Sequence, residues 1–88
     1  MTPQEAAAWL LEEVRRRGLL THEEARSWLE QADPSLLKRT SRGHLIIRTG
    51  VLRRFRKIRG DTVIWSVEGE FWRLRQPGES LGVRAVLV

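Results

Sequence analysis

The chain has 88 residues and a net charge of +5, from 16 lysines and arginines against 11 aspartates and glutamates. A chain of this length supports one small domain with a modest core, so we expect residues 1–88 to form a single domain. It contains no cysteine, which excludes a disulfide framework, thiolate catalysis and zinc bound by cysteine.

The first helix is predicted to begin at Thr2 and Pro3 and to end at Gly18. Threonine is a favoured N-cap, proline suits the first helical position, and glycine suits the residue after the last turn. Apolar residues between these ends recur at the spacing of one helix face, namely Ala7, Leu10, Leu11 and Val14. Trp9 lies beside this face, so we expect it at the rim of the core.

The second helix is predicted to follow Thr21 and to stop near Pro34. Thr21 and Glu24 have the spacing of a capping box, in which each side chain accepts a backbone N–H of the other residue. Proline disfavours a helical residue before it. The expected buried face consists of Ala25, Trp28, Leu29 and Ala32. We expect the first two helices to pack against each other.

Residues 35–48 allow two interpretations. The favoured one is a β-hairpin, with strands at Leu36–Arg39 and His44–Arg48 joined by a turn at 41–43. The other is a short helix that ends near Arg39 and is followed by a single strand. Both include a strand in the second half, because the sequence Leu-Ile-Ile is rich in β-branched residues.

A third helix is predicted within Arg48–Arg59, with Thr49 as its N-cap and Gly60 as its stop. Its apolar face consists of Val51, Leu52, Phe55 and Ile58. The opposite face is basic and consists of Arg53, Arg56 and Lys57. Arg54 and Arg59 flank the apolar face. The segment therefore predicts a short helix with one face for the core and one for a binding partner.

Residues 62–75 alternate between apolar and polar side chains, which predicts a β-hairpin with its turn at Glu68 and Gly69. The resulting register pairs Trp65 with Trp72 and Val63 with Leu74. Arg73 and Arg75 then lie on the opposite face. Residues 78–88 are expected to form a tail or an extra strand, with Val83–Val88 as that strand or as a dimer contact.

Positive charge is concentrated in the second half of the chain. Residues 1–37 carry a net charge of −3 and residues 38–88 carry +8, with nine basic residues and no acid from Lys38 to Arg59. This asymmetry favours a polyanionic partner, although a solvated basic face without a partner is the alternative. Arginine contacts phosphates and reads guanine edges. The predicted nucleic-acid-binding residues are Arg53, Arg56, Lys57, Arg73, Arg75, Arg42 and Arg48.

No motif for catalysis or metal binding is complete. His22 and Glu23 begin like a zinc protease motif, but Arg26 occupies the place of the second histidine. The only other histidine is His44, and we interpret both as surface residues. Adjacent glutamates point in different directions on a helix, so they do not form an acid and base pair. We therefore expect no enzyme activity, no metal and no cofactor.

Composition and hydropathy indicate the setting. No segment has the roughly 20 apolar residues that span a bilayer, and no secretory signal pattern begins the chain, so we expect a cytoplasmic protein without a membrane partner. Of the 16 basic residues, 14 are arginine, and asparagine is absent. The scarcity of thermolabile residues fits a thermophilic source, although the general signal of such proteins is lysine and glutamate rather than arginine, and a GC-rich genome would also favour arginine.

Several segments carry a resemblance to known proteins: T-P-Q-E-A-A-A-W-L, V-L-R-R-F-R-K-I, D-T-V-I-W and F-W-R-L-R-Q-P-G-E. They resemble a family of short, uncharacterised bacterial proteins, a domain of unknown function, over nearly the whole chain. Residues Pro34–Thr40 depart from it, since the family has an aromatic-bearing segment there. The resemblance implies a fold but no activity. The order of elements also looks like a winged-helix domain with an elaborated middle.

The expected fold is therefore a small α+β domain, winged-helix-like, with two helices, a middle β-segment, a basic third helix and a β-hairpin. In a winged helix, one helix enters the major groove and the hairpin contacts the backbone or the minor groove. We expect duplex DNA as the partner, bound without enzymatic chemistry. The alternative is a small protein-interaction or assembly module, because four tryptophans are many for this length and tryptophan is enriched at interface hot spots.

Overall fold

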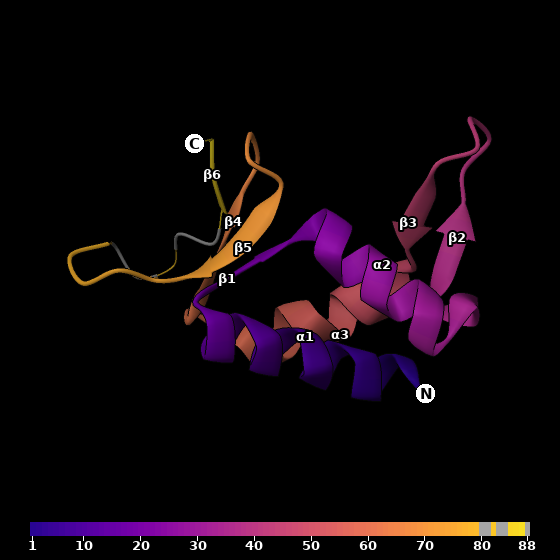
Figure 1. Ribbon diagram of the computed structural model, residues 1–88. Helices are drawn as coiled ribbons and strands as arrows, with labels where there is room; N and C mark the ends of the chain where they lie inside the picture. The colour runs from indigo at the N-terminus through magenta and orange to yellow at the C-terminus, as the bar shows by residue number, and fades with distance from the viewer. Residues whose placement is uncertain (80–81, 83–84, 88) are drawn as a thin grey trace.

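The computed structural model describes residues 1–79, 82 and 85–87, which form a small α+β domain. Its helices are α1 (Pro3–Arg17), α2 (His22–Ala32) and α3 (Thr49–Arg59), with a 3-10 turn at Pro34–Leu36. Its strands are β1 (Leu19–Thr21), β2 (Leu37–Arg39), β3 (Leu45–Ile47), β4 (Val63–Ser66), β5 (Phe71–Leu74) and β6 (Ala85–Val86). The mixed sheet β1-β5-β4-β6 lies at one end of the helices and the hairpin β2-β3 at the other (Figure 1).

The ends of α1 and α2 confirm the predicted caps. The hydroxyl of Thr2 accepts from the backbone N–H of Glu5, and Glu5 accepts in return from that of Thr2. Thr21 and Glu24 form the same reciprocal pair at the start of α2. Gly18 ends α1 in the left-handed conformation, with φ of 80°. These helix ends are thus determined by residues a few positions apart.

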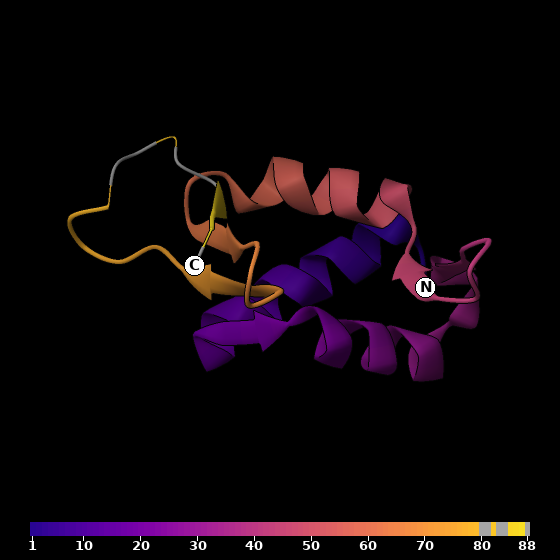
Figure 2. The ribbon, with the colours of Figure 1, turned by 90° about the horizontal axis from the view of Figure 1, so that it is seen from above.

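The packing of the helices differs from the prediction. The predicted face of α1 is buried, but α1 packs mainly against α3 rather than α2 (Figure 2). On α2 only Ala25 and Leu29 are buried, while Ala32 is exposed and Trp28 is 36% exposed. Trp28 instead lies flat against Trp9 of α1. The predicted buried face of α2 is therefore confirmed for Ala25 and Leu29 and wrong for Trp28 and Ala32, because α3 takes the place beside α1.

The middle segment forms the favoured hairpin, preceded by a single 3-10 turn. Strands β2 and β3 pair antiparallel, with Leu37 opposite Ile47 and Arg39 opposite Leu45. Asp33 caps the preceding turn by accepting from the backbone N–H of Ser35. The hairpin is thus held to the core by the buried Leu37–Ile47 pair, which leaves its loop at residues 40–43 projecting away from the helices (Figure 1).

The predicted phase of α3 is wrong at its C-terminal end. Val51 and Phe55 are buried as expected, but Ile58 is 45% exposed and Arg59 is only 8% exposed. The buried line therefore runs at i, i+4 and i+8, and the guanidinium carbon of Arg59 lies 5.7 Å from the centre of the Phe55 ring. Thr49 is also not the N-cap, since it is the first helical residue and Arg48 precedes the helix without a side-chain cap.

The predicted register of the C-terminal hairpin is confirmed. Trp65 lies opposite Trp72, and Val63 lies opposite Leu74. However, β5 is an inner strand that pairs with both β1 and β4, so the hairpin is part of a sheet and not a free wing. Within the expected strand Val83–Val88, Ala85–Val86 forms β6 parallel to β4, while residues 83, 84 and 88 lie outside the described residues.

Candidate nucleic-acid interface

The outward face of α3 is an exposed basic surface. Arg53, Arg56 and Lys57 are all exposed, as predicted, on the side away from the buried Val51 and Phe55. None of the three side chains makes a hydrogen bond or an ion pair with another described residue. Their charges therefore face solvent without a carboxylate to neutralise them, which is the condition for attracting an anion at long range.

The hairpin β2-β3 adds further positive charge beside the N-terminal end of α3 (Figure 2). Arg42 is exposed in its loop. Arg48 is also exposed, and its Nε donates to the backbone carbonyl of Ser35 at 2.6 Å, which holds the side chain near the start of α3. Lys38 and Arg39 are exposed on β2 as well. These two were not among the predicted nucleic-acid-binding residues, although both lie in the acid-free stretch from Lys38 to Arg59.

Arg73 and Arg75 have protein partners. The Nη1 and Nη2 atoms of Arg73 donate to the two carboxylate oxygens of Glu79 at 2.8 and 2.9 Å. This pairing raises the pKa of Arg73 and, with the backbone N–H of Gln76, lowers the pKa of Glu79 to about 2. Arg75 donates from Nε to the backbone carbonyl of Asp61, and its Nη2 lies 3.9 Å from that residue's carboxylate.

The turn of this second hairpin is acidic. Glu68 and Glu70 are exposed between β4 and β5, while Ile64, directly opposite Arg73, is fully buried. The structure thus places Arg48 directly before α3 and Arg42 in the loop of the first hairpin, which projects away from the helices. It places Arg73 and Arg75 on the sheet, where acidic groups hold them.

A cavity of about 450 Å³ lies between α3 and the sheet, and sequence reasoning did not foresee it. It is lined by His22, Leu52, Phe55, Arg56, Arg59, Trp65, Trp72 and Ala85. The ring centres of Trp65 and Trp72 are 4.8 Å apart, and that of His22 is 6.2 Å from Trp65 and 5.9 Å from Trp72. No carboxylate belongs to the described residues that line it.

His22 is therefore not the surface residue that we expected. Burial lowers its pKa, the charge of Arg26 lowers it further, and Glu70 acts weakly in the opposite direction. The imidazole is thus neutral near pH 7, with one nitrogen as donor and one as acceptor. No local signal marks this position, because the rings that surround it come from the other end of the chain.

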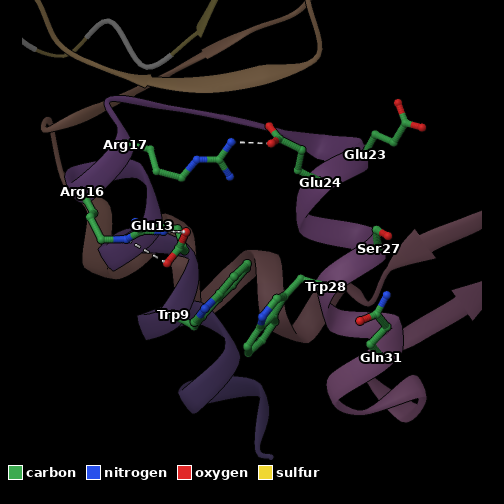
Figure 3. A pocket seen from close by; sticks show the side chains of 9 residues that line it. All are labelled: Trp9, Glu13, Arg16, Arg17, Glu23, Glu24, Ser27, Trp28 and Gln31. Atoms are coloured by element: carbon green, nitrogen blue, oxygen red, sulfur yellow. Dashed lines mark hydrogen bonds and ion pairs between the residues drawn. The ribbon is translucent and has the colours of Figure 1, made fainter.

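A second groove, of about 590 Å³, lies between α1 and α2 (Figure 3). At its base the rings of Trp9 and Trp28 stack at 3.8 Å with an angle of 8° between their planes. Both arginines along it are paired within the protein, because Arg16 bonds Glu13 at 2.6 Å and Arg17 bonds Glu24. We interpret this groove as the contact region between two helices. Its two tryptophan rings stack on each other, and its two arginines are bound to glutamates.

The described residues contain no group of three or more His, Asp or Glu side chains that could hold a metal ion. In the same part of the chain, every helix is too short or too polar to cross a bilayer.

Comparison with known protein families gives a match over most of the chain. The model of DUF6953, described as a family of unknown function, matches residues 2–74. No curated protein and no solved structure is significantly similar to the chain.

Proposed function

The chain belongs to the DUF6953 family of unknown function, and we propose from its surface that it binds duplex DNA without chemical conversion. The observation that carries this proposal is the exposed face of α3, on which Arg53, Arg56 and Lys57 have no acidic partner among the described residues. A helix with such a face fits the major groove, where arginine and lysine reach phosphates and guanine edges. The cytoplasm, where DNA is accessible to a bacterial protein, is part of this proposal.

The order of elements supports the same function. A strand between α1 and α2 pairs with the second strand of the hairpin that follows α3, so we propose a winged-helix-like domain with the hairpin β2-β3 inserted before the recognition helix. In this arrangement α3 is the element that enters the groove. A shared fold alone does not assign a function, so the charge of the helix face remains the main support.

We propose that the DNA backbone is contacted from α3 and from the first hairpin. Arg42 and Arg48 extend the basic surface beyond the N-terminal end of α3, in positions suited to neighbouring phosphates. Arg73 and Arg75 contribute less in this proposal than their spacing in the sequence suggested. Their guanidinium groups are already bound to Glu79 and Asp61, so each would have to leave a partner to reach DNA.

A mobility-shift titration on random duplex at several salt concentrations tests the proposal. Each neutralised phosphate contributes about −0.9 to the slope of log affinity against log salt, so five contacts predict a slope of about −4.5. The triple variant R53Q/R56Q/K57Q should lower the affinity and reduce the slope by about 2.7. Its fold should survive, because all three side chains are exposed.

The charge-matched control is R15Q/R16Q/R17Q, which removes three positive charges from the end of α1. It should retain a steeper slope than the α3 variant, because Arg16 and Arg17 are bound to glutamates. Equal losses of affinity in both variants would mean that net charge, and not the exposed face of α3, causes the binding. Absence of binding by the unmodified protein at low salt would contradict the proposal and favour the alternative, a protein-interaction module.

A further inference from the structure

The cavity beside α3 joins the basic face to a set of aromatic rings. Arg56 belongs to both, because its side chain is exposed on α3 and also lines the cavity. Trp72 and Phe55 form the buried wall, at 5% and 2% exposure, and their rings meet edge to face at 5.4 Å. Trp65 is only partly buried, with its ring centre 4.8 Å from that of Trp72. The accessible aromatic surface of the cavity therefore includes Trp65, and the exposed guanidinium of Arg56 belongs to the same lining.

The chemistry of this lining selects among ligands. Aromatic faces favour flat, π-rich groups, and arginine favours phosphate or carboxylate. The neutral imidazole of His22 adds one hydrogen-bond donor and one acceptor, and the described lining has no carboxylate to repel an anion. A volume of about 450 Å³ is in the usual range for small-molecule sites. It leaves space for a sugar and a phosphate beside a ring.

We propose that the cavity binds a nucleotide, with the base stacked on Trp65 and the phosphate held by Arg56. His22 lies at the edge of the same cavity, within reach of the hydrogen-bonding edge of the base. One source of this nucleotide is an unpaired nucleotide within a nucleic acid that is bound on α3, and for this source the inference rests on the proposed function. The other source is a free mononucleotide, which presents the same base and phosphate.

Tryptophan fluorescence tests this inference in the full chain carrying W9F and W28F, so that the signal comes from Trp65 and Trp72. The ligands are thymidine monophosphate, a single-stranded oligomer of eight thymidines, and an abasic oligomer of the same length. We expect saturable quenching by at least one ligand that carries a base and none by the abasic strand. Quenching by the monophosphate indicates a free nucleotide site, and quenching by the oligomer alone indicates a strand site.

Two variants locate the contacts. W65L should weaken binding of the quenching ligand by roughly 5- to 150-fold, as expected for the loss of one base-stacking side chain, and leave binding of the abasic strand unchanged. In the otherwise unmodified protein, W28L is the matched control and should leave binding unchanged, because Trp28 lies in the other groove. Arg56 is exposed, so the R56Q variant should fold. It should weaken the binding of thymidine monophosphate more than the binding of thymidine, because thymidine lacks the phosphate.

Failure of this inference is distinguishable from failure of the proposed function. If duplex binds with the expected salt slope but no base-bearing ligand quenches Trp65, the nucleotide site is overturned and the DNA surface stands. If the duplex fails to bind but the monophosphate quenches the fluorescence, the nucleotide site is supported and the proposed DNA-binding function is overturned. Equal effects of W65L and W28L would also overturn the inference.

Discussion

Neighbouring groups decide the role of each described arginine, and three cases on α3 and the sheet show the contrast. Arg53 and Arg56 project into solvent from α3. Arg59, on the same helix, is covered and lies against the Phe55 ring, where its stem contributes to packing. Arg73 is bound through both terminal nitrogens to Glu79. Only the first kind offers an uncompensated charge to a partner, so a count of basic residues overstates the binding surface.

At the scale of the residue, Phe55 and Ile58 provide a matched pair on α3. Phe55 is buried between α3 and the sheet, so Phe55→Ala should reduce the free energy of unfolding by about 3–5 kcal/mol. Ile58 is 45% exposed, so Ile58→Ala should change it by about 0.5 kcal/mol. Urea denaturation followed by circular dichroism measures both values. Comparable losses in the two variants would mean that the phase of α3 is different.

At the scale of the element, helix ends depend on the backbone conformation that each terminal residue can adopt. Gly18 has φ of 80° at the end of α1, a conformation that costs other residues roughly 1–2 kcal/mol. Gly50 lies in the first turn of α3, and a Cβ there would meet only Arg54 Nη1 within 4 Å, at 3.5 Å. Both glycines sit in helix termini, but only one needs to be glycine.

Gly18→Ala should therefore destabilise the protein by about 1 kcal/mol, because alanine is strained at this position. Gly50→Ala should stabilise it by about 0.4–1 kcal/mol, because it restricts the unfolded chain without a clash. Thermal or urea unfolding of the two variants checks the opposite signs. A stabilising Gly18→Ala would argue against the left-handed cap of α1.

At the scale of the whole molecule, α1 is the element around which the others assemble. It packs along α3, stacks Trp9 on Trp28 of α2, and continues through Gly18 into the sheet. An ion pair between Arg17 and Glu24 links the end of α1 to the start of α2 across β1. The hydrogen bond from Arg17, followed by those from Thr21, lowers the pKa of Glu24 from 4.5 to about 2.

This linkage predicts how stability depends on pH. Because the pKa of Glu24 is lower in the folded chain, its contribution is complete above about pH 4.5 and is lost as the pH falls towards 2. Glu24→Gln should lower the urea midpoint at pH 7 and flatten its decline between pH 4.5 and 2. Glu23→Gln removes the same charge from a residue without a partner in the described chain, and is the matched control. Parallel curves for the unmodified protein and Glu24→Gln would contradict the linkage.

The sequence by itself determined several local features of this protein. The N-cap at Thr2, the capping box at Thr21, the end of α1 at Gly18 and the pairing of Trp65 with Trp72 depend on residues close together in the chain, so pattern and spacing were sufficient. The candidate face of α3 was predictable for the same reason, since one helix carries all of its residues.

Only the tertiary structure decided which residues share a site. Whether Arg73 meets solvent depends on Glu79, and whether His22 is covered depends on Trp65 and Trp72. The phase of α3 also shifted towards Arg59, because the core around the helix, and not its own apolar pattern, selects the buried line. The rings around His22 come from segments that no local periodicity relates to it, and the periodicity of β5 does not show that Arg73 turns to Glu79, so these contacts follow from the packing of the folded chain.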